Sequence, residues 1–326
     1  MVDKIKNNKT LIISVKIAIS IAIAWAVIYN VDKVELKYIL QNAKVKYIFY
    51  ALLLLPLNLY FQFLKWKYAA QKAVGEKIPH KPLWLSVFLG IALGFVTPGR
   101  VGELGKLFAL REQDKLKLLS MSMIEKIYDT FPVIIFGSFS LAFLPTLFFT
   151  DSSLMRANLM LFSFLIAILF YFIAVHPGLF RSIVNYIRLN LFKKSSRFER
   201  FSAGLDGLKN GTARILLLLS TMLFFVYTAQ FVLLIFAFGQ IDVFHAFAGV
   251  WTAVLLKTFL PVSLGDIGVR EGTAAYVFSL LGFPIPAAVS AAFMLFAINI
   301  LMPTIGGLFM IPFTFRQKKN EKEVIE

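Results

Sequence analysis

The chain of 326 residues contains no cysteine and few charged residues. Without cysteine there is no disulfide, no thiolate nucleophile and no cysteine-ligated metal. Charged residues make up only 16% of the chain and hydrophobic residues 59%. Soluble domains carry about 25% charged residues, so the composition predicts an integral membrane protein.

Acidic residues and histidines are also scarce. There are 18 acidic against 34 basic residues, which gives a net charge of +16. The basic residues gather in loops and tails, where we expect them to meet anionic lipid head groups; we expect no nucleic acid partner. His80, His176 and His245 stand in separate loops without the spacing of metal ligands, so we expect no metal and no cofactor.

Long apolar runs indicate where the chain crosses the membrane, because about 20 apolar residues span a bilayer as a helix. Six runs are long enough: Leu11–Tyr29, Tyr47–Leu64, Ile127–Phe149, Leu154–Val175, Ile215–Phe238 and Ala287–Phe313. We expect the first to stay in place as a transmembrane helix, since it is too long for a signal peptide core and lacks a small-residue cleavage site.

Basic residues predict the orientation, because loops rich in lysine and arginine stay on the cytoplasmic side. The segment Phe180–Arg214 is rich in both. By this rule we expect it, both termini and the segment Lys65–Lys81 to be cytoplasmic, in a multi-pass protein of the cell membrane. The links around Asp151 and Asp242 carry almost no positive charge and are predicted to lie outside.

Two segments are predicted to be amphipathic helices at the membrane surface. One has apolar residues at helical spacing between lysines that must lie outside: Leu36, Ile39, Leu40 and Ala43. The other is predicted to rest on anionic lipid on the cytoplasmic side, with the apolar stripe Phe180, Ile183, Val184, Ile187 and Leu191.

Two pairs of shorter apolar runs require a different explanation. Leu83–Val96 and Leu104–Met123 flank one polar segment, and Phe244–Leu260 and Thr273–Phe283 flank another. With the loops assigned as above, each pair must leave the membrane on the side where it entered. We therefore expect two re-entrant broken-helix hairpins that enter from opposite sides.

The predicted fold class follows from these assignments. It is an all-α, polytopic membrane protein with six full spans and two re-entrant hairpins. Each half of the chain then holds two spans, one hairpin and one span, in opposite orientations, which is an inverted-topology repeat. We treat residues 1–326 as a single transmembrane domain with halves of approximately 1–150 and 151–315 and a cytoplasmic tail at 316–326.

The hairpin tips carry the charges. Gly99-Arg100-Val101-Gly102-Glu103 aligns with Gly265-Asp266-Ile267-Gly268-Val269, and a proline precedes each. A charged side chain near the bilayer centre costs about 3 kcal/mol on insertion scales, so such residues indicate function. The candidate substrate site comprises Gly99, Arg100, Gly102, Glu103, Lys257, Gly265, Asp266, Gly268, Arg270 and Glu271.

The residue types at the tips suit an anionic ligand. The glycines let the backbone approach a ligand, and we expect free backbone N–H groups at the start of each returning helix, which attract phosphate. Arg100 and Arg270 can each bind a phosphate group through two hydrogen bonds. Glu103, Asp266 and Glu271 can neutralise the arginines or bind a coupling cation. The alternative is a buried ion network that only locks the two halves together.

Three further ionisable residues have open roles. Glu125 and Asp129, with Lys126 beside them, are predicted at the start of a span, where they can gate the cavity or take a proton. An anchoring charge cluster at a helix end is the alternative. Lys257 can reach Asp266 or a lipid phosphate, or it can extend toward the membrane surface.

The motifs resemble those of a known family. Pro98–Glu103, Glu125–Asp129 and Gly265–Glu271 are similar to signature segments of the flippase-like transmembrane domain of lysyl-phosphatidylglycerol synthases. The likeness extends from about Leu11 to Phe313. It implies a lipid flippase-like transporter. The chain stops at Glu326 without the synthases' soluble domain, so we expect no aminoacyl transfer and no particular lipid is implied.

We therefore expect a non-enzymatic transporter that moves an anionic phospholipid or polyprenyl-phosphate lipid between leaflets through a polar cavity. Arg100 and Arg270 are expected to be required for movement. Two alternatives stay open, namely an intramembrane enzyme that modifies lipid phosphates and a non-transporting membrane partner of cell-envelope enzymes. A separate lipid-modifying or glycan-assembly enzyme is a candidate partner of the transporter. The oligomeric state, the energy source and the direction of transport are open.

Overall fold

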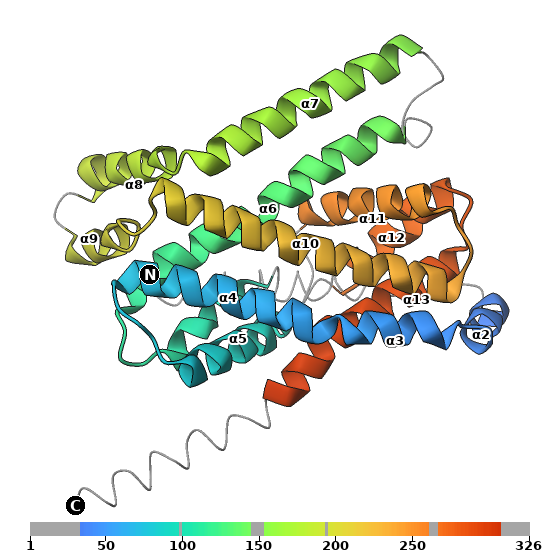
Figure 1. Ribbon diagram of the computed structural model, residues 1–326, viewed down its shortest axis with the longest axis horizontal. Coiled ribbons are helices and arrows are strands. Elements are labelled where there is room, and N and C mark those ends of the chain that lie inside the picture. The colour runs from blue at the N-terminus through green and yellow to red at the C-terminus, as the bar shows by residue number, and fades with distance from the viewer. Residues whose placement is uncertain (1–32, 98–99, 145–152, 193–194, 261–266, 308–326) are drawn as a thin grey trace, which may run out of the picture.

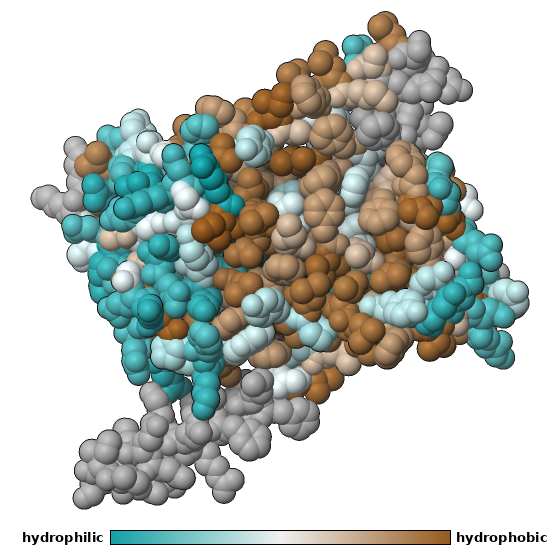
Figure 2. All heavy atoms as spheres, viewed as in Figure 1, coloured by the Kyte–Doolittle hydropathy of each residue, from teal (hydrophilic) through white to brown (hydrophobic). Residues whose placement is uncertain are grey.

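The computed structural model describes residues 33–97, 100–144, 153–192, 195–260 and 267–307. Within these ranges the elements are helices and there is no strand, as predicted for an all-α membrane protein. The longer helices run along the long axis of the molecule (Figure 1). Figure 2 shows a hydrophobic belt between two hydrophilic ends, which is the surface of a protein embedded in a bilayer.

Within the described ranges, three helical segments are long and apolar enough to cross a membrane, or four if the bent pair Met160–Val175 and Gly178–Leu191 counts as one span. The first is Val45–Val74, which comprises α3 (Val45–Leu53) and α4 (Leu55–Val74). The second, α10 (Asn210–Phe238), packs against both. The third consists of α13 (Ile285–Phe296), a π-helical turn η3 (Ala297–Leu301) and a further turn to Gly307.

These segments confirm helices at the predicted runs Tyr47–Leu64 and Ile215–Phe238. The predicted run Ala287–Phe313 is helical as far as Gly307. Its remainder and the whole of Leu11–Tyr29 lie outside the described residues. At one hydrophilic end lie the link after α4, helix α8 (Gly178–Leu191) and helix α9 (Ser196–Ala203); we call this the basic end. Helix α2 (Lys33–Gln41) lies at the opposite end.

Helix α6 (Lys115–Phe143) corrects two sequence predictions. It begins at Lys115 because the Asp114 carboxylate accepts hydrogen bonds from the backbone N–H groups of Leu116 and Lys117. The predicted hairpin arm Leu104–Met123 is therefore too long, and the predicted span starts well before Ile127. As a consequence, Glu125 and Asp129 lie in the interior of α6 and not at its start.

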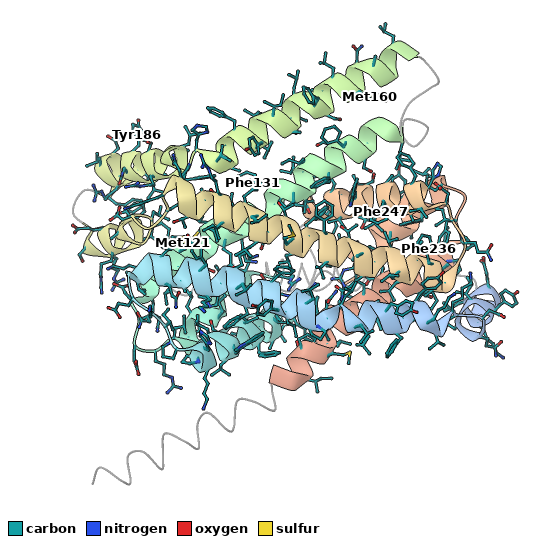
Figure 3. All side chains as sticks on the ribbon, viewed as in Figure 1. Met121, Phe131, Met160, Tyr186, Phe236 and Phe247 are labelled. Atoms are coloured by element: carbon teal, nitrogen blue, oxygen red, sulfur yellow. The ribbon has the colours of Figure 1, made fainter. Side chains whose placement is uncertain are left out.

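Helix α7 (Ser153–Val175) meets α8 at an angle of 68°. Figure 3 labels side chains on α6, α7 and α8. Met121 and Phe131 on α6 are buried, whereas Met160 and Tyr186 are exposed. The predicted apolar stripe lies on the helix α8, where Phe180 and Val184 pack against the core and Ile183 and Leu191 are exposed.

The first hairpin consists of α5 (His80–Phe95) and the 3-10 helix η1 (Val101–Ala109), which pack side by side. α5 starts at the basic end, directly after α4 (Figure 1). A Cβ atom added at Gly102 would lie 2.1 Å from the carbonyl oxygen of Leu93, and one at Gly105 would lie 2.3 Å from the Leu93 side chain. The two arms can approach this closely only because these positions are glycine.

The second hairpin consists of α11 (Val243–Thr258) and α12 (Val269–Leu280), which also pack side by side. α11 starts at the end opposite to the basic end, where α10 finishes (Figure 1). α12 begins after Gly268, whose φ of +83° favours glycine. The helices α5 and α11 each have 16 residues, so neither is long enough to span a membrane alone.

Candidate functional site

A cavity of about 450 Å³ lies inside the bundle, and both hairpins contribute to its wall. Its other walls come from α4, α6, α10 and the segment from α13 to η3. Among the described residues, six basic and three acidic side chains line it: Lys65, Arg100, Lys106, Lys126, Lys257, Arg270, Glu103, Glu125 and Asp129. The lining thus carries an excess of three positive charges. It attracts anions.

The tip of the first hairpin is joined to α6 by ion pairs. Glu103 lies 2.5 Å from the Arg100 guanidinium and 2.5 Å from Lys126 Nζ on α6. Arg100 adopts a left-handed backbone conformation with φ of +54°, which is uncommon for a residue with a side chain. Since the pair Arg100–Glu103 spans three residues, this turn brings the two side chains of the tip together.

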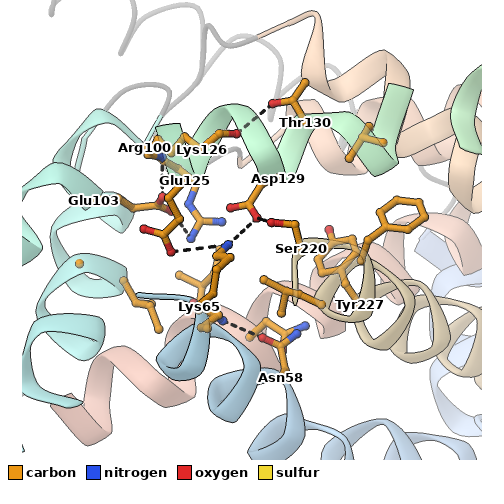
Figure 4. A pocket seen from close by; sticks show the side chains of 18 of the residues that line it. Asn58, Lys65, Arg100, Glu103, Glu125, Lys126, Asp129, Thr130, Ser220 and Tyr227 are labelled. Carbon is orange, nitrogen blue, oxygen red and sulfur yellow. Dashed lines mark hydrogen bonds and ion pairs between the residues drawn. The ribbon is translucent and has the colours of Figure 1, made fainter. Parts of the chain in front are cut away.

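A second group of ion pairs lies deeper in the protein. Lys65, only 2% exposed, pairs with Asp129 and lies 3.6 Å from Glu125. Lys106 pairs with Glu125 and lies over the ring of Trp66, with Nζ 3.8 Å from the ring centroid. Ser220 on α10 donates a 2.8 Å hydrogen bond to Asp129. Figure 4 shows the end of the Lys65 side chain next to both Glu125 and Asp129, with Ser220 on the other side of Asp129. Lys65 and Glu125 are buried, and each has an opposite partner, as burial requires.

Arg270 is placed differently. It lies in the first turn of α12, is 3% exposed, and its guanidinium carbon is 5.5 Å from the Phe296 ring centroid. Among the described residues no carboxylate lies within ion-pair distance of it, and its Nε has no hydrogen-bond acceptor. A buried guanidinium without an acceptor is costly, so this side chain is suited to an anionic ligand.

Neutral polar side chains extend the cavity away from these charges. Asn58 and Asn299 both donate to the side-chain oxygen of Gln230, at 3.1 and 2.9 Å, and Gln62 donates to Asn58 at 2.7 Å. Gln230 in turn donates to the carbonyl of Ala51. We call Asn58, Gln62, Gln230 and Asn299 the amide cluster. Asn299 lies in the π-helical turn η3, and such turns often occur at functional sites.

The structure brings most of the predicted charged site residues together. Arg100, Glu103, Lys257 and Arg270, predicted to bind substrate, line the cavity, as do the predicted gating residues Glu125 and Asp129. The predicted residues Gly99, Gly265 and Asp266 lie outside the described residues.

The expected free N–H groups at the hairpin tips are not found at the two glycines. The N–H of Gly102 donates to Thr97 Oγ1 at 2.7 Å, and the N–H of Gly268 donates to the Glu271 carboxylate at 2.7 Å. Neither glycine lines the cavity, and Glu271 does not line it either. The described cavity wall therefore offers side-chain cations, and Glu271 caps the start of α12.

Sequence reasoning missed part of the site. Lys65 was predicted at the cytoplasmic surface, which is wrong, because it lies buried in α4 beside Asp129. Lys106 had no predicted role. A signal for the amide cluster was present in the sequence, since Asn58, Gln62, Gln230 and Asn299 interrupt apolar runs. Asn58, Gln62 and Lys65 are also spaced for one face of a helix.

Comparison with protein families gives a match over nearly the whole chain. Residues 13–307 match the model of the lysylphosphatidylglycerol synthase TM region. A search of curated proteins returned no match. The match covers both hairpins and every described residue of the cavity wall. The chain belongs to the family of the lysylphosphatidylglycerol synthase transmembrane region.

Proposed function

We propose that this membrane protein moves an anionic lipid between the two leaflets without changing it chemically. The lipid is a phospholipid or a polyprenyl-phosphate lipid, and its head group passes through the cavity while its tails stay in the bilayer. One observation carries the proposal. The cavity has an excess of positive charge, and it includes a buried arginine, Arg270, with no acidic partner among the described residues.

The chemistry of phosphate fits this site. A phosphate monoanion or diester offers oxygens in the geometry that a guanidinium binds with two parallel hydrogen bonds. Such a ligand would satisfy the Arg270 Nε group that lacks an acceptor. The phosphate's charge would be balanced by cations that the protein already holds inside the membrane. The free-energy cost of taking the head group out of water would therefore be smaller than in bare hydrocarbon.

The course of the chain supports an alternating-access mechanism. Helices α3 and α4 run toward the basic end, the first hairpin starts there, and α6 leaves it. Helix α10 runs away from the basic end, the second hairpin starts at the opposite end, and α13 returns. We interpret this as one domain with two inverted halves, the arrangement in which secondary transporters hold a site near the bilayer midplane. In this proposal six spans and two hairpins form the domain, and the basic end and both termini face the cytoplasm.

The rival interpretation is a buried ion network that only locks the halves together. It suits Lys65 and Lys106, which are paired with Glu125 and Asp129. It does not account for Arg270, because a residue that serves as a lock needs an opposite charge to hold, and among the described residues no carboxylate pairs with Arg270. We therefore assign the lock to Lys65, Lys106 and their acidic partners, and ligand binding to a site that includes Arg270.

Transport in vesicles tests the proposal. The protein is reconstituted into liposomes with a trace of fluorescent phosphatidylglycerol, and an impermeant reductant quenches the label in the outer leaflet. We expect the wild-type protein to expose inner-leaflet lipid and Arg270→Ala to slow this movement strongly. Arg188→Ala on the surface of α8 is the matched control and should behave as wild type. Failure of the wild-type protein to move any lipid would overturn the proposal, and a chemically altered lipid in the extract would replace it with an enzyme.

A further inference from the structure

The cavity has two levels along the axis of α4. Asn58, Gln62 and Lys65 all line it, at a spacing that places them on one face of the helix. Lys65 marks a charged level with Glu125 and Asp129. Asn58 marks a neutral level with the amide cluster. At the rise of an α-helix the two levels are about 10 Å apart.

Helix α10 repeats this division in the opposite direction. Ser220 bonds to Asp129 at the charged level. Tyr227, two turns further along α10, lines the cavity, and Gln230 one turn beyond bonds to Asn58 at the neutral level. Figure 4 shows Asn58 and Tyr227 on one side of Lys65, with Arg100 and Glu103 on the other. Along these two antiparallel helices, charged and hydroxyl side chains therefore line one level of the cavity and uncharged polar side chains line the other.

The neutral level has polar atoms without partners. The hydroxyl of Tyr227 and the side-chain oxygen of Asn299 are buried and make no hydrogen bond within the described part of the chain. Asn299 already donates to Gln230, so its oxygen is left to accept. A phenol can donate or accept, and an amide oxygen accepts. Both are suited to the hydroxyl groups of a ligand, and leaving them unpaired in the interior is unfavourable.

At the charged level, in contrast, each described carboxylate of the wall is already ion-paired. Glu103 is paired with Arg100 and Lys126, Glu125 with Lys65 and Lys106, and Asp129 with Lys65. These are the three acids among the described residues of the wall. An ammonium group in the cavity would meet an excess of positive charge and would have to displace an existing lysine or arginine to find an anion.

We propose that the cavity selects lipids whose phosphate carries an uncharged hydroxyl-bearing substituent, such as glycerol or a sugar, over lipids with amine head groups. The phosphate lies among the cations and the hydroxyls bond to Tyr227 and the amide cluster. This inference rests on the proposed function, since it specifies the lipid that the transporter moves. It distinguishes the chain's ligand from an aminoacylated lipid, whose ammonium groups the wall does not accommodate.

Three labelled lipids with identical acyl chains test the selection. Phosphatidylglycerol carries phosphate and hydroxyls, phosphatidic acid carries phosphate alone, and phosphatidylethanolamine carries an amine. We expect the wild-type protein to move phosphatidylglycerol fastest and phosphatidylethanolamine slowest. Free glycerol 3-phosphate should inhibit the movement of phosphatidylglycerol more strongly than free phosphoethanolamine does. This second measurement needs no variant.

Tyr227→Phe isolates the neutral level. The change removes a hydroxyl that has no partner in the described structure, so the melting temperature should not fall. Movement of phosphatidylglycerol should drop roughly fivefold, the worth of one hydrogen bond, while movement of phosphatidic acid stays unchanged. Tyr128→Phe is the matched control, because the Tyr128 hydroxyl bonds to the Ala174 carbonyl away from the cavity. It should lower the melting temperature and leave the order of the three lipids as it is.

The outcomes separate the two proposals. A loss of phosphatidylglycerol movement in Tyr227→Phe, with phosphatidic acid unaffected, supports selection by hydroxyls. Equal movement of all three lipids, or no effect of Tyr227→Phe on any of them, overturns the selection and leaves lipid transport standing. If the wild-type protein moves none of the three, the proposed function fails and the selection fails with it.

Discussion

The two hairpins share a sequence pattern but hold their cations in different ways. In the first, Arg100 pairs with Glu103, Lys106 pairs with Glu125, and glycines bring the arms into contact. In the second, Arg270 is buried against Phe296, and no carboxylate of the described structure lies within ion-pair distance of it. The comparison teaches that a charge motif at a hairpin tip does not by itself reveal a binding group. What distinguishes the two is whether the protein already supplies the counter-charge.

The largest effect is expected from removing the two tip arginines one at a time. Arg270→Ala should lower lipid movement in vesicles by about 100-fold, because a bidentate bond between guanidinium and phosphate is worth roughly 3 kcal/mol. Arg100→Ala should lower it less, by about tenfold, since Lys126 still faces the same region. Equal losses in the two variants would show that both hairpins contribute alike to lipid movement. That result would contradict the difference between Arg100 and Arg270 drawn above.

For stability we expect the larger effect at a lysine that is paired with acids, and the smaller effect at Arg270. Lys65→Met takes the positive charge away from the buried Glu125 and from the partly exposed Asp129, and should cost about 3 kcal/mol of unfolding free energy. Arg270→Met removes a charge without a described partner and should cost little. Denaturant unfolding in detergent measures both. A severe loss of stability in Arg270→Met would mean that this arginine is part of a structural lock.

Replacing a glycine of either hairpin with alanine should lower the unfolding free energy, but for a different physical reason in each hairpin. Gly102→Ala forces a methyl group against the Leu93 carbonyl and should cost about 2 kcal/mol through overpacking. Gly268→Ala imposes a positive φ on a residue with a side chain and should cost about 1 kcal/mol. Gly306→Ala, where a methyl group meets nothing, is the control for both. If Gly102→Ala is as harmless as the control, the first hairpin is not closely packed.

The smallest expected effect is that of low pH on the stability of the first helical turn of each hairpin, in α5 and in α11. The backbone N–H of His245, and then its side chain, hold the pKa of Asp242 below its usual value, and this carboxylate caps α11. A lowered pKa stabilises the helix start above pH 4 and the effect is lost as the pH falls through the native pKa. The start of α5 has Pro79 and no side-chain cap.

Hydrogen exchange measures this difference. Between about pH 5 and pH 3 the first turn of α11 should lose protection, after correction for intrinsic rates, while the first turn of α5 should not. In Asp242→Asn the cap remains but does not titrate, so the change with pH should disappear. Loss of protection at both helix starts would assign the change to general acid unfolding.

The parts of the structure that follow from local sequence were predictable. Apolar runs predicted helices, and the two polar segments marked where α5 ends before η1 and where α11 ends before α12. The charges Arg100, Glu103, Glu125, Asp129 and Arg270 were identified because ionisable residues stand out in apolar surroundings. The start of α6 was misplaced because the capping carboxylate of Asp114 was not recognised as a helix start.

The pairing of the charges could not be derived from the sequence. Lys65 resembles any lysine that follows an apolar run, and only the packing of α4 on α6 places it beside Asp129. In the same way the amides of Asn58, Gln230 and Asn299 meet through contacts between helices far apart in the chain. Glu271 was misjudged for the opposite reason. A local hydrogen bond to Gly268 engages a carboxylate that had been expected in the cavity.

Thiol labelling tests the central claim, a water-accessible polar cavity at membrane depth that binds lipid, most directly. The chain has no cysteine, so a single introduced thiol is read without background. Thr130→Cys lies in the cavity wall and Leu165→Cys lies exposed on the apolar surface of α7. In membranes we predict that a charged thiol reagent modifies the first variant and not the second, and that added phosphatidylglycerol protects the first. An unreactive thiol at position 130, or equal reaction at both positions, would contradict the account.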